Sequence, residues 1–377
     1  MKGAAWYPVR RRRWGLGRVF RVQHLFGTRL DWAVLALALC LLVTGIWFVH
    51  GMEQADIDFD RSDVDFRGHL RKVALAFPAL VLGLLVRPKW LRKNAYAFYL
   101  VAIALLLLVP IVGEERNNAR RWIPLPVIGF DLQPSELAKL GLILALARAL
   151  YQARLQRWGE WGLPALLALL PMGLVVQQPD LGTAMTVVPV SLGLFYLAGA
   201  DARRILLVVG AGVLAALLAF RFELVRDYQL QRVDTWLETL AAEDLIEKKN
   251  GPAFHTYHAH VAIGNGALWG TGIGRGVANE AGHLPERDSD SIFAVMAEEL
   301  GLIGTALLVL AYTALIAALL VRASTIRERF ARLVVGGIGL YFAAHFFINV
   351  GVNLGLLPMT GLTLPLFSTG GTITGAR

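Results

Sequence analysis

The chain has 377 residues, of which 56% are hydrophobic and only 17% are charged, and its formal net charge is +9. A soluble globular protein of this size carries more charged surface, so the composition excludes a soluble enzyme and favours a membrane protein. The single cysteine, Cys40, excludes a disulfide framework or a cysteine-based metal site within one chain.

The apolar residues form runs of about 20, the length that an α-helix needs to cross a bilayer. These runs begin near Trp32, Leu70, Ala95, Glu136, Gly162, Thr183, Ile205, Asp290 and Leu333. Strands of this length would need a closed barrel to satisfy their backbone in lipid, so helices are expected. The sequence therefore predicts an all-α, polytopic membrane protein with about nine apolar spans.

Basic residues occupy alternate connections between these runs, which sets the expected orientation. Residues 1–30 are rich in Lys and Arg and precede an apolar run too long for a removable signal peptide, so we expect a basic cytoplasmic tail. Further basic clusters lie at 87–93, 154–157, 203–204 and 322–332, the cytoplasmic loops under the positive-inside rule. The positive charge thus indicates insertion in the inner (cytoplasmic) membrane with the N-terminus in the cytoplasm, and no nucleic-acid partner is expected.

The other connections are expected on the outer face: 51–69, 113–135, 176–182, 222–289 and 355–371. Connection 222–289 is the longest, and loops of this length are usually functional or disordered. We therefore expect residues 31–377 to form a single polytopic membrane domain with a large outer loop at 222–289.

Acidic side chains in or beside a span are costly and are therefore functional candidates. Asp290 and Glu298 are eight residues apart, which would place both on one face of a helix entering the bilayer. The alternative for Asp290 is an N-terminal acid that complements the helix dipole. For Glu298 and Glu299 the alternative is an ion pair with an arginine from another span.

Other polar clusters fall on the outer connections. Arg120 and Arg121 have the planar guanidinium groups that bind phosphate oxygens, although an ordinary solvated loop would contain them as well. His345, Asn349 and Asn353 recur every four residues, which predicts a polar stripe that faces protein or water. The histidines at 255, 258 and 260 have no acid or cysteine to complete a zinc site, so a metal is not favoured there.

Taken in order, these clusters and their flanks resemble the SEDS family (shape, elongation, division and sporulation), whose best known members are RodA and FtsW. The similar blocks are Glu115–Trp122, Gln133–Lys139, Gln178–Ala184, Ala262–Gly266, Leu284–Gly301 and the closing stretch from Asn349 to Gly371. Together they cover nearly the whole chain, and six ordered blocks are far more specific than any single one.

The resemblance implies a SEDS-type helical bundle of about ten spans, with the last one truncated in this sequence. It also implies a peptidoglycan glycosyltransferase that polymerises lipid II into β-1,4-linked glycan strands for cell elongation or division. Asp290 stands at the position of the family's essential acid, and Glu115 at that of an acid near the outer end of the third span. Polar residues of the matched blocks are expected to bind substrate: Arg120, Arg121, Gln178, Asp180, Glu286, Glu298, Asn349 and Ser368.

Joining sugars with inversion needs a base for the acceptor hydroxyl and positive charge for the leaving diphosphate. We expect Asp290 to be the base. The charge would come from Arg120 and Arg121 or from a divalent cation, Mg²⁺ or Mn²⁺, and Glu115 would orient an arginine or hold that cation. No organic cofactor is expected, and the sequence assigns no metal ligands.

The resemblance implies a class B penicillin-binding protein, a transpeptidase, as partner. Two other functions are alternatives: a lipid II flippase or transporter, for which paired broken helices or an internal repeat would be expected, and a non-catalytic cell-wall scaffold, which would need none of the acids. The chain departs from the family pattern at several positions, with Asp288 where the family has His and Thr369 where it has Tyr. These departures, which include Asn118, His258 and Ser291, leave the RodA-like and FtsW-like branches both open.

Overall fold

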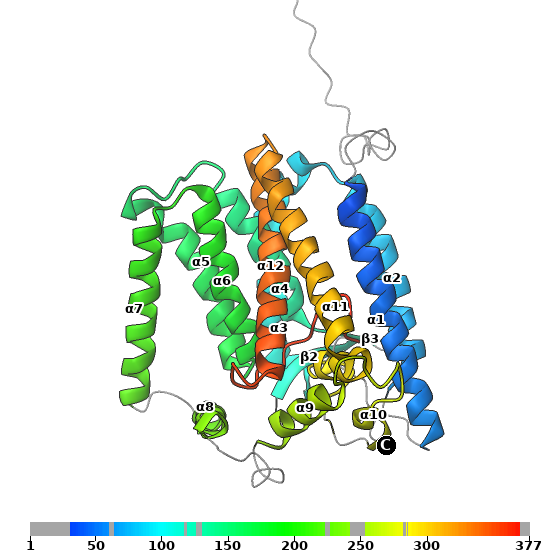
Figure 1. The fold of residues 1–377 in the computed structure, drawn as a ribbon. Coiled ribbons are helices and arrows are strands. Elements are labelled where there is room, and N and C mark those ends of the chain that lie inside the picture. Colours follow the sequence, from blue (N-terminus) through cyan, green and yellow to red (C-terminus); the bar gives the residue numbers. More distant parts are fainter. Residues whose placement is uncertain are drawn as a thin grey trace, which may run out of the picture.

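The computed structural model describes residues 31–59, 64–116, 119–125, 130–222, 227–241, 253–281, 284 and 286–369. Within these residues, seven helices are long and apolar enough to cross a membrane. They are α1 (Trp32–Asp58), α2 (Phe66–Leu85), α3 (Pro88–Val112), α6 (Leu181–Ala198), α7 (Ala202–Arg221), α11 (Ile292–Thr325) and α12 (Arg329–Asn353). Two shorter helices, α4 (Pro134–Ala149) and α5 (Gly162–Gln177), run beside them in the bundle (Figure 1).

Each of the nine predicted apolar runs therefore forms a helix, and the predicted all-α polytopic fold is confirmed. The expected tenth span and the basic tail at 1–30 lie outside the described residues. The predicted large loop at 222–289 is partly helical, because its described parts form α8 (Asp227–Ala241), α9 (Phe254–Asn265) and α10 (Val277–Ala281).

Two apolar clusters hold the bundle together. One joins α3, α4, α5 and α6 with the first half of α12, and the other joins α1, α9, α11 and the segment that follows α12. By contrast, α7 buries no residue, and α2 buries only His69. The core thus lies around α4, α6, α11 and α12, and α2 and α7 flank it.

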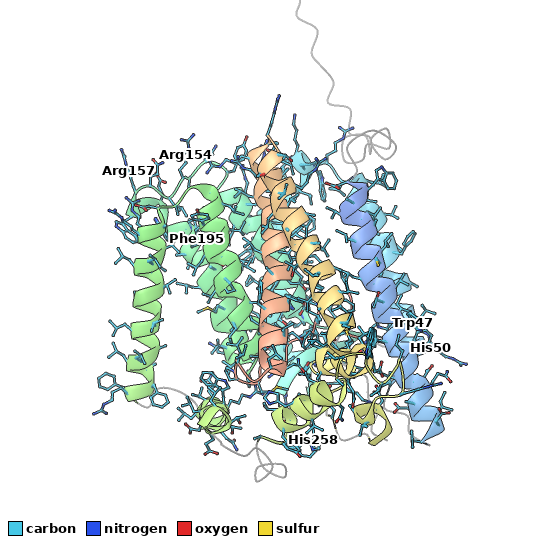
Figure 2. The ribbon with its side chains drawn as sticks, viewed as in Figure 1. Trp47, His50, Arg154, Arg157, Phe195 and His258 are labelled. Carbon is cyan, nitrogen blue, oxygen red and sulfur yellow. The ribbon has the colours of Figure 1, made fainter. Side chains whose placement is uncertain are left out.

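The two ends of the bundle differ in the helices and loops that they contain. Helices α8, α9 and α10 gather at one end with the C-terminal ends of α1 and α12 (Figure 1), and we call this the site end. Figure 2 shows Arg154 and Arg157 at the opposite end from His258. The basic loops and the motif-bearing connections are therefore on opposite ends, as the alternating charge pattern predicts.

A small antiparallel sheet lies at the site end, in the order β1 (Glu114–Arg116), β2 (Ala119–Leu125), β3 (Phe130–Leu132). The register pairs Glu115 with Arg120 and Glu114 with Trp122. The sheet carries the Glu115–Trp122 motif, so the two arginines of that motif stand on a strand. Because side chains alternate along a strand, Arg120 and Arg121 point to opposite faces.

The long helix α11 is broken at Gly301, whose φ is +66°. The glycine-rich stretch 266–274 enters the break. The amide groups of Thr271 and Gly272 donate to the carbonyls of Glu298 and Glu299, and those of Leu302 and Ile303 donate to the carbonyls of Ala267 and Leu268. A Cβ at Gly301 would lie 2.2 Å from the Gly270 nitrogen, so only glycine fits there.

Candidate active site

Asp290 lies in a tight turn that leads into α11, not inside the helix. The amide groups of Ser289 and Ser291 donate to the Glu286 carbonyl, at 3.0 and 3.1 Å. The expectation that Asp290 and Glu298 share one helix face is therefore wrong, because the helix begins only at Ile292. The turn leaves the half-buried Asp290 carboxylate at the site end.

The polar stripe of α12 fixes the backbone of this turn. Asn349 and Asn353 each donate from Nδ2 to the Asp290 carbonyl at 3.0 Å. Both asparagines and His345 are almost completely buried, so the prediction that this stripe faces protein and not lipid is confirmed. Asn349, predicted to bind substrate, holds the backbone of the candidate base in this structure.

A segment after α12 covers the other side of the carboxylate. Gly361 has a φ of +69°, and a Cβ there would lie 3.4 Å from Asp290 Oδ2. Asn349 Nδ2 also donates to the Leu362 carbonyl at 2.7 Å, so the same amide joins this segment to the Asp290 peptide.

Three acidic groups lie close together here. Ser289 Oγ is 3.1 Å from Glu286 Oε2 and 3.2 Å from Asp290 Oδ1. A hydroxyl has one proton to donate, so it satisfies one of these oxygens at a time unless a carboxyl carries a proton. Burial raises the pKa of Asp290 to about 7, with the charges of Glu286 and Asp288 adding to this rise and Ser289 and Arg121 opposing it.

Arg121 reaches the site from β2. Its Nε donates to the Gln178 carbonyl at 3.2 Å, and its guanidinium also contacts the Pro179 carbonyl. Its positive charge is close enough to Asp290 to lower the pKa of that carboxyl. Of the two motif arginines, Arg121 is therefore the one placed beside the candidate base.

Arg120 and Glu115 lie elsewhere. They form an ion pair with each other at 3.3 Å on the exposed face of the hairpin, and Arg120 also donates to the Pro110 carbonyl. The two arginines therefore do not form a joint clamp, because the strand directs them to opposite faces. Glu115 orients an arginine, one of the two roles predicted for it, but that arginine is directed away from Asp290.

The other predicted substrate ligands support the fold around the site. Gln178 donates to the Leu106 carbonyl at 2.8 Å, and Asp180 caps α6 by accepting from the Thr183 amide. Ser368 donates to the Leu364 carbonyl within its own turn. Their side chains are engaged by protein, and Glu286, which contacts Ser289 Oγ, is the more exposed side chain near Asp290.

Glu298 is completely buried, and its carboxylate accepts hydrogen bonds from Asn265 and from the amides of Val277 and Ala278. Glu299 accepts from the Gly274 amide at 2.9 Å and from Asn279. These two acids hold the glycine-rich stretch and α10 against α11. Among the residues that the structure describes, neither has an arginine as ion-pair partner, which was the alternative considered from the sequence.

Two further contacts at the site were missed by the sequence reasoning. Asp56, at the end of α1, forms a buried ion pair with Arg287. Thr369 Oγ1 donates to Asp288 Oδ2 at 2.6 Å, and burial raises the pKa of Asp288 although this bond opposes the rise. These two residues, both singled out in the sequence as departures from the family pattern, are thus in direct contact.

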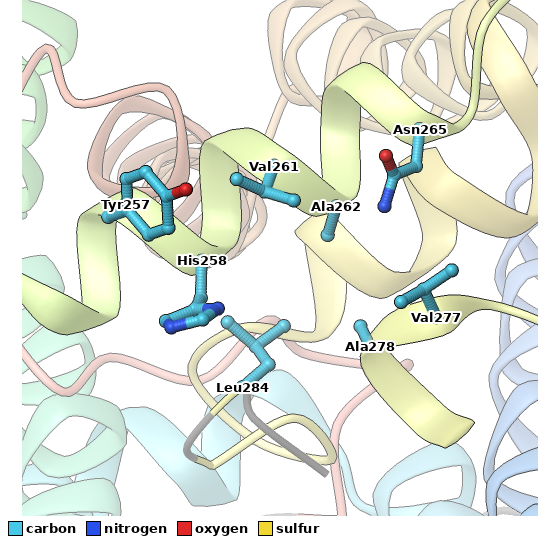
Figure 3. Close-up of a pocket in the computed structure, with 8 residues that line it drawn as sticks. All are labelled: Tyr257, His258, Val261, Ala262, Asn265, Val277, Ala278 and Leu284. Atoms are coloured by element: carbon cyan, nitrogen blue, oxygen red, sulfur yellow. The ribbon is translucent and has the colours of Figure 1, made fainter. Parts of the chain in front are cut away.

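A pocket of about 270 Å³ opens at the site end (Figure 3). One face of α9, from Tyr257 to Asn265, lines it together with Val277 and Ala278 of α10 and Leu284. His258 lies in this pocket, whereas His255 pairs with Ser291 Oγ. In the described part of the chain, no three His, Cys, Asp or Glu residues are placed to hold a metal ion.

Comparison with known proteins identifies the family. The model of the FtsW, RodA and SpoVE family, described as cell cycle protein, matches residues 29–375. The probable peptidoglycan glycosyltransferase FtsW of Halomonas elongata is 33% identical over 94% of this chain and 90% of its own length. The peptidoglycan glycosyltransferase MrdB of Escherichia coli K12 is 33% identical over 91% of this chain and 89% of its own.

Solved structures agree with this result. One chain of a peptidoglycan synthase complex, described as coordinating polymerization and crosslinking, is 33% identical with a TM-score of 0.73, over 91% of this chain and 93% of that one. The rod shape determining protein RodA of Thermus thermophilus is 30% identical with a TM-score of 0.63, over 91% of both chains. The chain belongs to the FtsW, RodA and SpoVE family, which is the SEDS family that its motifs predicted.

Proposed function

We propose that this chain is a peptidoglycan glycosyltransferase that polymerises lipid II into β-1,4-linked glycan strands, with Asp290 as the general base. Its curated relatives are named peptidoglycan glycosyltransferases and are covered over about nine tenths of their length. The observation that carries the residue assignment is the half-buried Asp290 carboxylate in the turn before α11, next to Ser289 and Glu286, where burial raises its pKa to about 7. A base with a pKa near the working pH accepts a proton efficiently and is still ionised in a large fraction of molecules.

In this mechanism Asp290 takes the proton of the acceptor sugar hydroxyl as the oxygen attacks the anomeric carbon. The anomeric carbon gains oxocarbenium character while the lipid diphosphate leaves. Glu286 and Asp288 keep the proton affinity of Asp290 high, and the hydrogen bonds that Asn349 and Asn353 donate to the Asp290 carbonyl fix its position.

We propose that Arg121 stabilises the leaving diphosphate. It is held by the carbonyls of the 178–179 turn and lies near enough to Asp290 for their charges to interact. A guanidinium has five donors, so it can contact these carbonyls and still offer groups to phosphate oxygens.

A divalent cation fits the same place. Mg²⁺ is commonly bound by one or two carboxylates and by substrate phosphates, and Glu286 and Asp290 supply two adjacent carboxylates linked through Ser289. Such a cation would neutralise charge on the diphosphate, but it would also lower the pKa of Asp290. We therefore propose it as the alternative to Arg121, with no organic cofactor.

The flippase alternative receives little support from the break in α11. Transporters use broken helices to line a binding cavity, whereas this break is filled by the backbone of residues 267–272. The scaffold alternative gives no reason for three carboxylates to crowd beside an arginine. Polymerisation is therefore the function that the site supports best.

The test of Asp290 is its replacement by asparagine, which keeps the shape but cannot accept a proton. We expect Asp290→Asn to abolish lipid II polymerisation by purified protein in detergent, measured as polymer on a gel. Asp58→Asn, an exposed acid at the end of α1, is the matched control and should polymerise normally. Normal polymer from Asp290→Asn would remove Asp290 from the role of base.

We further propose that the site end faces the outside of the inner membrane, where a class B penicillin-binding protein would crosslink the new strand. The similar chain from a peptidoglycan synthase complex supports the partner, and the basic loops at the opposite end support the orientation. In a Cys40→Ala background, cysteines at 120 and 290 should react with impermeant reagents in spheroplasts, and those at 92 and 327 should not. Labelling of 92 and 290 from the same side would contradict this orientation.

A further inference from the structure

A buried polar cluster between α4 and α12 has no role in the mechanism above. Lys139 Nζ lies 2.8 Å from Glu136 Oε1 and 2.8 Å from His345 Nε2. Tyr341 donates to the other oxygen of Glu136 at 3.2 Å. Lys139 and His345 are at most 4% exposed, so this charge is held inside the bundle.

The contacts determine which nitrogen of His345 carries the proton. An ammonium group has three donors and no acceptor, so His345 Nε2 must accept from Lys139. The proton of the neutral ring is therefore on Nδ1, which lies 3.0 Å from the Thr363 carbonyl and donates to it. Lys139 thereby makes His345 a donor toward the segment that follows α12.

That segment reaches the candidate base within two residues. Thr363 is held by His345, Leu362 by Asn349, and Gly361 lies against the Asp290 carboxylate. His345 and Asn349 are one helical turn apart, so α12 binds two successive carbonyls of the segment with two successive turns. Asn349 also holds the Asp290 peptide, whereas His345 acts on the segment alone.

We propose that His345 is a positioning residue for the glycosyl transfer, and that the ion pair of Glu136 and Lys139 serves to keep it in the tautomer that holds Thr363. The inference rests on the proposed function of Asp290. It gives a reason for the almost complete burial of the Lys139 ammonium, which is costly even when a half-exposed carboxylate such as Glu136 pairs with it. Loss of the Thr363 bond would let Gly361 move away from the carboxylate and alter where the acceptor hydroxyl meets it.

The experiment compares two substitutions of one residue. A glutamine at 345 has an oxygen that can accept from Lys139 and an amide that can donate to Thr363, whereas a leucine fills space and makes neither bond. We expect His345→Leu to lower kcat by about 10²-fold with little change in KM for lipid II, because a small misplacement near the reacting atoms has this effect. His345→Gln should restore most of the turnover, and Phe347→Leu, on the exposed face of α12, should match the unmodified protein.

Hydrogen exchange of residues 355–369 gives a readout that does not depend on activity. This segment should exchange faster in His345→Leu than in His345→Gln. Should His345→Leu fail to fold because Lys139 loses one of its two hydrogen-bond acceptors, the triple variant Glu136→Gln, Lys139→Met and His345→Leu removes both charges of the ion pair and should show the same loss of turnover and the same faster exchange.

The proposal is overturned if leucine keeps kcat within about twofold, if glutamine fails as badly as leucine, or if only KM changes. It is also overturned if exchange of 355–369 is the same in both variants. Failure of the proposed function is distinguishable from these results, because it would appear as normal polymerisation by Asp290→Asn.

Discussion

Two arginine–carboxylate ion pairs at the site end differ in how far they are exposed to solvent. Arg120 and Glu115 are five residues apart on one hairpin, 3.3 Å from each other, and their side chains are 52% and 57% exposed. Arg287 and Asp56 come from distant parts of the chain, and their side chains are only 5% and 1% exposed.

The difference in exposure decides what each pair contributes. An exposed pair is screened by water and is worth about 0–1 kcal/mol. A buried pair contributes little net stability, but losing one partner leaves an unpaired buried charge. Arg287 also donates to the Asn279 carbonyl, so the buried pair fixes the turn before Asp290 to α1 and α10. Arg121 lies between these extremes, half-buried and beside the candidate base.

The largest effect should come from breaking the buried pair. Arg287→Met is expected to destabilise the protein by about 3–5 kcal/mol, because Asp56 keeps a buried charge without its partner. Thermal unfolding in detergent measures this, with Arg120→Met as the matched control at about 1 kcal/mol or less. The double variant Asp56→Leu and Arg287→Met should recover much of the loss. Equal destabilisation by the two arginine variants would contradict the distinction.

The next largest effect should be a difference in turnover between variants of Arg121 and variants of Arg120. Arg121→Ala is expected to lower kcat by about 10²-fold, as the loss of a transition-state donor does in other enzymes. Arg121→Lys should recover part of this, since a point charge cannot make bidentate contacts. Arg120→Ala should keep kcat within about twofold because its side chain lies on the far face of β2.

Steady-state kinetics with lipid II separates the outcomes. If Arg121→Ala raises only KM, the arginine holds substrate and does not stabilise the transition state. A divalent cation would then be the main source of positive charge, and a chelator should abolish activity until metal is added back. Equal effects of the two alanine variants would contradict the placement of Arg121.

The smallest effect concerns the acids around Asp290. Only the ionised carboxylate accepts a proton, so kcat/KM should rise with pH and reach half its plateau near the Asp290 pKa of about 7. Glu286→Gln removes a negative charge that raises this pKa, so the midpoint should move to lower pH, by less than about one unit. The pH dependence of kcat/KM checks this, and a shift to higher pH would contradict it.

The same raised pKa has a consequence for stability. A carboxyl whose pKa is higher in the folded than in the unfolded state costs stability as the pH rises from about 4 to about 7. Asp290→Asn is therefore expected to unfold at the same or a higher temperature than the unmodified protein at pH 8, which also shows that its loss of activity is not a loss of fold.

The sequence predicted the spans well because apolar runs of membrane length have few alternative structures. It predicted the polar stripe of α12 for a similar reason, since a period of four residues sets one face. The two arginines could not be separated in this way. Residues 113–135 were expected as a loop, and only the observed strand shows that Arg120 and Arg121 face opposite sides.

The sequence also did not predict which residues pair over long distances along the chain. Nothing local to Asp56 indicates Arg287, and the Asp288–Thr369 contact joins two residues that the sequence marked only as departures from a family pattern. The sequence places Glu298 and Glu299 inside a continuous span. It contains no signal that distinguishes Gly301, where the helix is broken, from the other glycines in the spans. The backbone conformation and the tertiary contacts decide which residues these side chains meet. The periodicity of apolar residues in the sequence indicates neither of the two.

The break at Gly301 also bears on how the chain enters the membrane. Residues 302–325, at about 1.5 Å per residue, reach roughly 36 Å, which exceeds the roughly 30 Å hydrocarbon core without help from residues 292–300. The insertion machinery therefore needs to recognise only the apolar part beyond the break, and it need not draw Glu298 and Glu299 into lipid. The helical segment 292–300 can form afterwards, when the backbone of the glycine-rich stretch makes its hydrogen bonds at the break. We therefore expect that residues 302–325 can insert before the turn that holds Asp290 has formed.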